Sequence, residues 1–118
     1  MSTSSEGERP ARPDPVEAQL EAYNARSVDD FVRWFAEDVV VEDGLGAPVV
    51  SGREPMRERY RAMFAANPRL HCDVVSRVRV GAWVIDEERI TGRAPTEEHV
   101  VAIYRVVDGS IVHVRFLR

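Results

Sequence analysis

Apolar residues recur at helical spacing in three segments of the chain, which predicts three helices. Asp14-Pro15 predicts the start of the first helix, and Ser27 opens the second. Ser51 and Glu54 predict a capping box for the third helix, which Asn67-Pro68 ends. The apolar stripe of the second helix consists of Val28, Phe31, Val32 and Phe35. The buried face of the third consists of Met56, Tyr60, Met63 and Phe64.

Strand-like patterns fill the rest of the chain. Val39-Val40-Val41 predicts a strand that stops at the loop from Asp43 to Gly46, and Pro48-Val49-Val50 predicts a short second strand. From Leu70 to Leu117 the pattern predicts three strands, the first two long enough to merge into one bent hairpin. Helices first and a meander last predict an α+β fold, in which three N-terminal helices pack on one face of a curved antiparallel sheet.

Turn residues assign the side chains of this sheet to its two faces, which a shift of one residue would exchange. A three-residue loop with Gly109 in the left-handed position predicts an inner face made of Val100, Ala102, Tyr104, Val112, Val114 and Phe116. A two-residue turn at Gly81-Ala82 and a four-residue loop at Arg93-Ala94-Pro95-Thr96 then place further side chains on that face. These are Ile85, Glu87 and Arg89, while Asp86 and Glu88 join a solvated charge ladder outside.

Composition narrows the function classes. Residues 1–14 predict a disordered leader, because they are rich in serine, proline and charge, and residues 15–118 predict a single domain. The net charge is −4 and no lysine is present, which disfavours nucleic acid and membrane surfaces and excludes Schiff-base chemistry. Cys72 is the single cysteine, and no secretory or membrane segment is evident, so we expect a cytoplasmic protein.

Three histidines carry no metal-binding pattern. His71, His99 and His113 all fall on the predicted outer sheet face, and no ligand spacing for a metal ion links them. No glycine-rich phosphate loop occurs either. The sequence therefore predicts neither a metal nor a cofactor.

Several motifs resemble one family. Ala36-Glu-Asp-Val-Val-Val-Glu-Asp43 and Gly52-Arg-Glu54, followed by Tyr60-Arg61, are similar to the NTF2-like superfamily, above all its SnoaL-like and ketosteroid-isomerase branch. The closing Val107-Asp-Gly-Ser-Ile111 is also typical of it, and the resemblance covers residues 16–118. It implies a cone-shaped fold (a cystatin-like roll) with a pocket between the helices and the concave sheet, and usually a homodimer.

Asp43 and Tyr60 carry the chemistry that this resemblance implies. Asp43 matches the family's proton-shuttling aspartate, and a carboxylate in an apolar pocket can move a proton between carbons of an enone. The alternative is that Asp43 caps the loop from Gly44 to Gly46. Tyr60 matches a pocket tyrosine that supports the oxyanion hole, and its alternative role is that of a core aromatic.

The chain departs from the family at both oxyanion donors. The position of the family's protonated aspartate is Ala102, and that of its tyrosine falls near Leu20. Glu87, expected opposite Ala102, could replace the missing acid. Alternatively Glu87 pairs with Arg89, or Arg89 binds a carboxylate on the ligand.

These residues predict a pocket for a small apolar molecule and a cofactor-free isomerase, with Asp43 as base and Tyr60 and Glu87 as partners. Its expected lining consists of Phe35, Ile85, Arg89, Ala102, Tyr104, Val114 and Phe116. A non-catalytic dimeric module with a vestigial pocket is the alternative, and a hydrolase acting on an epoxide or lactone is a third. The outer face of the sheet carries the apolar residues Val101, Ile103 and Ile111, so we expect the homodimer interface there.

Overall fold

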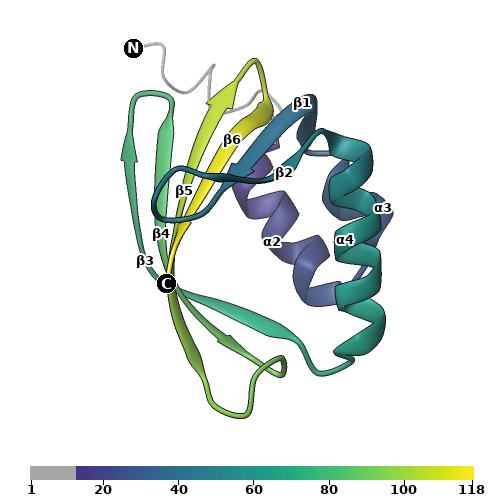
Figure 1. Cartoon of the computed structure of the whole chain (residues 1–118). Coiled ribbons are helices and arrows are strands. Elements are labelled where there is room, and N and C mark those ends of the chain that lie inside the picture. Colours follow the sequence, from purple (N-terminus) through teal and green to yellow (C-terminus); the bar gives the residue numbers. More distant parts are fainter. Residues whose placement is uncertain (1–12) are drawn as a thin grey trace, which may run out of the picture.

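A computed structural model describes residues 13–118, so most of the predicted leader lies outside the described residues. Within them the chain forms three helices and six strands (Figure 1). In chain order these are α2 (Pro15–Ala25), α3 (Val28–Val32), β1 (Phe35–Glu42), β2 (Pro48–Ser51), α4 (Arg53–Ala66), β3 (His71–Val80), β4 (Trp83–Thr91), β5 (Glu98–Val107) and β6 (Ser110–Leu117). None of these helices is long and apolar enough to cross a membrane.

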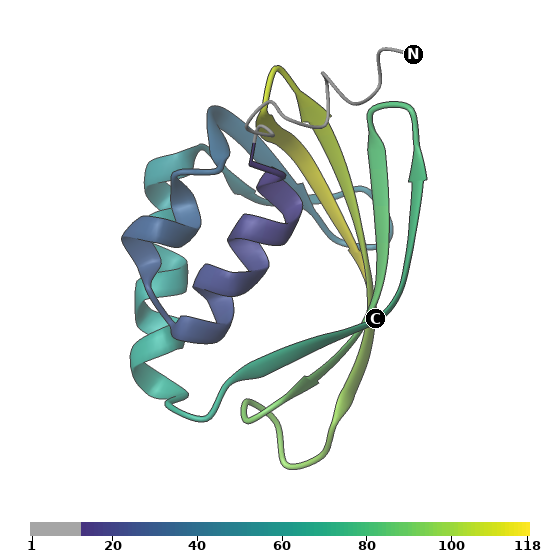
Figure 2. The same cartoon turned by 180° about the vertical axis from the view of Figure 1, so that it is seen from behind.

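The six strands form one curved sheet in the order β2-β1-β6-β5-β4-β3. All neighbours are antiparallel except β1 and β6, which run parallel. Figures 1 and 2 show the three helices on the concave side of the sheet, and no described helix covers the convex side. The α+β fold is therefore confirmed, with four strands rather than three after Leu70.

The helix termini follow the sequence signals in part. Asp14 caps α2 as expected, since its Oδ1 accepts a hydrogen bond from the backbone N of Val16 at 3.1 Å. The second helix is shorter than expected, and Phe35 begins β1 instead. The capping box of the third helix is wrong: Gly52 is the N-cap, with φ of 100°, and its backbone N donates to Val39 O. Ser51 stays in β2.

The β5–β6 hairpin places Ala102, Tyr104, Val114 and Phe116 on the inner face as predicted, but its loop differs from the predicted three-residue loop. Its loop has two residues, Asp108 and Gly109, both with positive φ, and Val107 pairs with Ser110. A bulge between Arg105 and Val106 then shifts the register, so that Tyr104 pairs with Val114 and Ala102 with Phe116. The same shift buries Ile111 completely, which removes it from the outer face on which it was expected.

The β4–β5 register differs from the prediction by one residue, and this exchanges the faces of β4. Asp86 pairs with Ala102 and Glu88 with Val100, so both carboxyl groups face inward. Strand β4 ends just before Gly92, which has φ of 87° and lies against the backbone of Arg69. A Cβ there would approach Arg69 O to 2.1 Å, so glycine is required at this exit.

An aromatic cluster joins the helices to the sheet. The ring of Phe31 lies with its centroid 4.6 to 6.0 Å from the rings of Tyr23, Phe35, Tyr60 and Phe64. These rings come from α2, β1 and α4, and Phe31 itself is buried. The cluster fixes the distance between the helix layer and the sheet, and so shapes the space between them.

Candidate functional site

Two adjoining cavities lie between the helices and the concave sheet. The inner cavity has a volume of about 40 Å³, and the outer cavity, beside β2, has a volume of about 200 Å³. Six residues line both: Val41, Tyr60, Met63, Arg93, Phe116 and Arg118. By volume the inner cavity holds roughly three water molecules, so it admits only the tip of a larger ligand.

Several residues expected in the pocket line the inner cavity. Phe35, Tyr104, Val114 and Phe116 contribute from the sheet, and Tyr60 contributes from α4. Ala102 faces the same side of the sheet and is fully buried. Four residues of the expected lining, Phe35, Tyr104, Val114 and Phe116, therefore line the inner cavity.

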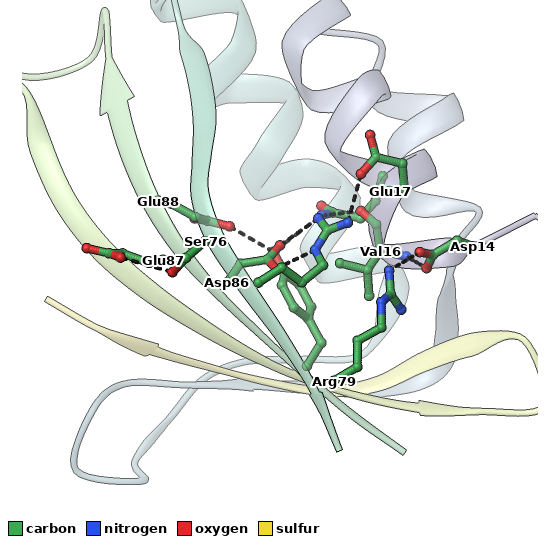
Figure 3. Close-up of polar contacts among 11 residues, drawn as sticks. Asp14, Val16, Glu17, Ser76, Arg79, Asp86, Glu87 and Glu88 are labelled. Atoms are coloured by element: carbon green, nitrogen blue, oxygen red, sulfur yellow. Dashed lines mark hydrogen bonds and ion pairs between the residues drawn. The ribbon is translucent and has the colours of Figure 1, made fainter. Parts of the chain in front are cut away.

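Glu88 is the carboxyl group in the wall of the inner cavity. Its residue is 4% exposed, and it lies on β4 beside Tyr104 of β5. The Tyr104 hydroxyl donates to Glu88 Oε2 at 3.4 Å, and Gln19 Nε2 of α2 donates to the Tyr104 oxygen at 3.3 Å. Figure 3 shows Glu88 and Glu87 pointing to opposite sides of β4. A short polar chain thus connects helix α2 to a buried acid.

Burial sets the electrostatics of this acid. Desolvation, and then the charge of Asp86, raise the pKa of Glu88 from its ordinary 4.5 to about 7. Hydrogen bonds from Tyr104 and Cys72 act in the opposite direction. Near neutral pH Glu88 is therefore present in both protonation states, which suits a group that accepts and returns a proton.

The phenols and the thiol of the inner cavity stay protonated. Burial raises the pKa values of Tyr23, Tyr60 and Tyr104, and it also raises that of the Cys72 thiol. The phenols are thus hydrogen-bond donors, and Cys72 is not a thiolate nucleophile. Compared with these phenols and this thiol, Glu88 has its pKa moved toward neutrality.

A second buried carboxyl group, Asp86, lies two residues along the same strand. Asp86 is fully buried and forms a two-pronged ion pair with Arg77, at 2.6 and 2.9 Å. Arg77 also binds Glu17 of α2 at 2.8 Å. Neighbouring Arg79 pairs with Asp14, which lies beside Glu17 and Val16 in Figure 3. This network ties the start of α2 to the sheet.

Glu87, Ile85 and Arg89 lie on the outer face, so their predicted placement in the pocket is wrong. The register difference of one residue is the physical reason. Glu87 accepts hydrogen bonds from Ser76 at 3.0 Å and His99 at 2.7 Å, which lower its pKa. Arg89 pairs with Glu97 at 2.8 Å rather than with Glu87. The hydrolase hypothesis, which needs a second carboxylate in the pocket, therefore cannot use Glu87 for that role.

Asp43 is exposed at the end of the β1–β2 loop, on the rim of the outer cavity. Its Oδ1 accepts hydrogen bonds from the backbone N of Leu45 at 2.9 Å and of Ala47 at 3.0 Å. This is the loop-capping geometry that the sequence offered as the alternative. Asp43 does not line the inner cavity.

The fold and the buried acid define a class: an α+β roll with a cavity between its helices and its curved sheet. The sequence matches the SnoaL-like domain over residues 16–114, and the chain belongs to this family. Among curated proteins no sequence matches it.

Solved structures agree on the fold. An uncharacterized cystatin-fold protein from Novosphingobium aromaticivorans superimposes with a TM-score of 0.84 at 28% identity, covering 93% of this chain and 100% of that one. A putative polyketide cyclase from Sinorhizobium meliloti gives 0.77 at 23% identity, with coverage of 88% and 94%. A protein from Catenulispora acidiphila with a ketosteroid isomerase-like fold, in complex with trimethylamine, gives 0.73 at 22%, with coverage of 90% and 85%. The predicted family resemblance is thereby confirmed.

Proposed function

We propose that this chain binds a small, largely apolar molecule and moves a proton on it through Glu88, without a cofactor. The observation that carries the proposal is a buried carboxyl group, with its pKa raised to about 7, in the wall of an otherwise largely apolar cavity. The tyrosine hydroxyls that share the wall supply neutral donors. Together they meet the requirements of general acid–base catalysis.

In the proposed reaction Glu88 takes a proton from a carbon next to a carbonyl group. The C–H bond breaks, its electron pair shifts onto the carbonyl oxygen, and an enolate and a protonated Glu88 result. The acid then returns the proton to a different carbon, so that substrate and product are isomers and no oxidant is needed. Tyr104 and Gln19 hold the carboxyl group, and the Tyr60 hydroxyl, which lines both cavities, serves as the donor to the enolate.

Glu88 takes the role that the sequence assigned to Asp43. Asp43 is exposed and its carboxylate caps its own loop through two backbone hydrogen bonds, whereas the base of this reaction gains from buried, apolar surroundings. Glu88 has those surroundings and faces the cavity. Asp43 instead contributes to the shape and charge of the cavity rim.

Cyclohex-3-enone is a suitable neutral probe of this proposal. Its conversion to the conjugated cyclohex-2-enone requires removal of one proton and its return two carbons away, and the product absorbs in the ultraviolet. We expect turnover whose rate rises with pH with a midpoint near 7, and NMR titration of the Glu88 side chain with the same midpoint. A Glu88 titration near 4, together with no turnover, would exclude the proposal.

The small inner cavity favours one alternative, a binding module without catalysis. A volume of about 40 Å³ accommodates little more than the tip of a ligand unless side chains move. Such a module would show the raised pKa of Glu88 and would still bind small molecules, but it would not convert cyclohex-3-enone.

We also propose that the chain forms a homodimer through its outer sheet face. Ile85 pairs with Ile103 across β4 and β5 in the centre of this face, and the exposed ring of Trp83 lies beside them. No described helix lies on the convex side of the sheet. Glu42 and Arg115, on the same face, supply charges of both signs that a two-fold axis can bring together.

Sedimentation at micromolar concentration is expected to give about twice the chain mass of 13.3 kDa. Ile103→Glu should produce a monomer, because it places a charge in the centre of an apolar contact. Leu45→Glu is the matched control, since Leu45 is an exposed apolar residue on the β1–β2 loop. A wild-type monomer would contradict the interface.

A further inference from the structure

We propose that the ligand of this pocket is a carboxylate, bound where the two cavities meet by Arg93, with Arg118 and Arg59 beside it. The inference rests on the proposed small-molecule function and names its ligand class. Arg93 and Arg118 line both cavities, and Arg59 lines the outer one. These three side chains come from α4, the β4–β5 loop and the residue after β6, so the fold brings them together from distant parts of the chain.

The Tyr60 phenol lies in the field of these three guanidinium groups. Although burial raises its pKa overall, the charges of Arg118, Arg93 and Arg59 all act in the opposite direction. Three guanidinium groups therefore lie within electrostatic range of one hydroxyl that borders both cavities.

Arg93 has the geometry of a carboxylate-binding group with one edge held in place. Its Nε and Nη2 donate to the two oxygens of Glu98 at 2.9 and 2.8 Å. Its Nη1 donates to Met63 Sδ at 3.5 Å, and Met63 lines both cavities. A thioether sulfur is a weak acceptor, so a carboxylate oxygen that enters the junction would replace it with a much stronger hydrogen bond.

Arg118 and Arg59 add charge beside this donor. Arg118 lies over the ring of Phe116, 5.2 Å from its centroid, with its Nη1 3.8 Å from Glu98. Arg59 has no ion-pair partner within residues 13–118. Glu98 thus orients two guanidinium groups but balances only one charge.

The acidic residues of the outer cavity do not neutralise the excess. Glu42 binds Arg115 at 3.1 Å and His113 at 2.9 Å, and these contacts lower its pKa. Asp43 is held by backbone amides of its own loop. The junction therefore keeps a positive excess that favours an anionic group.

Size and pH define the ligand further. The inner cavity admits a tip of about three non-hydrogen atoms, which is the length of the propyl chain of butyrate. Such a chain would reach toward Glu88 while its carboxylate stays at Arg93. Because an ionised Glu88 would repel a bound carboxylate, we expect binding to tighten as the pH falls through about 7.

The test compares butyrate with butyramide, which has the same shape without the charge, by NMR titration of the protein at pH 6. Butyrate should bind about tenfold more tightly, as expected for a charge-assisted hydrogen bond replacing a neutral one. Arg93→Gln should remove this preference. Arg89→Gln, which alters an arginine paired with a glutamate on the outer face, should keep it.

Arg118→Gln is a second variant, in case Arg93→Gln does not fold, and should reduce the preference several-fold. Equal binding of butyrate and butyramide to the wild-type protein would overturn the inference, and so would an unchanged preference in folded Arg93→Gln. Turnover of the neutral cyclohex-3-enone does not depend on a carboxylate. Failure of the ligand class is therefore distinguishable from failure of the proposed proton transfer.

Discussion

Replacing Glu88 with glutamine is expected to lower the rate of cyclohex-3-enone isomerisation by about 10²–10⁴-fold. The substitution keeps the shape of the side chain and its capacity to accept a hydrogen bond from Tyr104, but removes the group that takes the proton. Because Gln19 orients Tyr104 from α2, the local geometry has no reason to change. The rate is measured by the ultraviolet absorbance of the conjugated product.

Glu87→Gln is the matched control, since Glu87 precedes Glu88 in the chain and lies on the opposite face of β4. It should leave the rate unchanged. A Glu88→Gln variant with the wild-type rate, or an equal loss in both variants, would contradict the role of Glu88. The pH dependence supplies a further check: the midpoint near 7 should vanish with Glu88.

Stability provides a measurement of the same group that needs no substrate. The pKa of Glu88 is about 7 in the folded protein and 4.5 ordinarily, so between these values the folded state binds more protons than the unfolded state. The free energy of unfolding therefore falls as the pH rises through this window, by about 3 kcal/mol from this group, and levels off above it. Urea unfolding at pH 5 and pH 8 should show this slope in the wild type and a smaller one in Glu88→Gln.

The parts of the fold that could be predicted from the sequence follow short motifs whose effect on the nearby backbone is not changed by contacts with distant residues. Asp14-Pro15 starts a helix, Asn67-Pro68 ends one, and Gly81-Ala82 turns a hairpin, because each signal acts within a few residues of its own backbone. The missed features depend on distant parts of the chain. Gly92 leaves the sheet because the backbone of Arg69 lies against it, and no periodicity near Gly92 records that contact.

To predict which residues form the candidate site, the strand register mattered more than the residue types. From Asp86 to Arg89 every residue is charged, so polarity does not tell which of them face inward. Arg93 and Arg118, which line both cavities, lie in a loop and after the last strand, where the alternation of inward and outward side chains does not apply. Tyr104 of β5 and Val114 and Phe116 of β6 were placed on the inner face correctly, because their alternation with polar neighbours survives the bulge. Ile111 was not, since the bulge shifts the register beside it.

Removing the charge of Arg77 is expected to lower the free energy of unfolding by about 3 kcal/mol. In Arg77→Met the long apolar stem is kept, but the fully buried Asp86 loses both hydrogen bonds of its ion pair. Arg77 is itself only 19% exposed in its side chain, so water gives the pair little screening. The contact from Arg77 to Glu17 of α2 disappears as well. Urea unfolding at pH 7 measures the loss.

Arg79→Met is the control for this variant, because Arg79 and its partner Asp14 are far more exposed and such pairs contribute about 1 kcal/mol or less. A double variant, Arg77→Met with Asp86→Leu, should regain most of the stability, since the unpaired buried charge is what costs free energy. It should also lower the pKa of Glu88, because Asp86 is a cause of its elevation, and Arg77→Met alone should raise it. Equal losses in Arg77→Met and Arg79→Met would show that the pair does not hold α2, and with it Gln19, against the sheet.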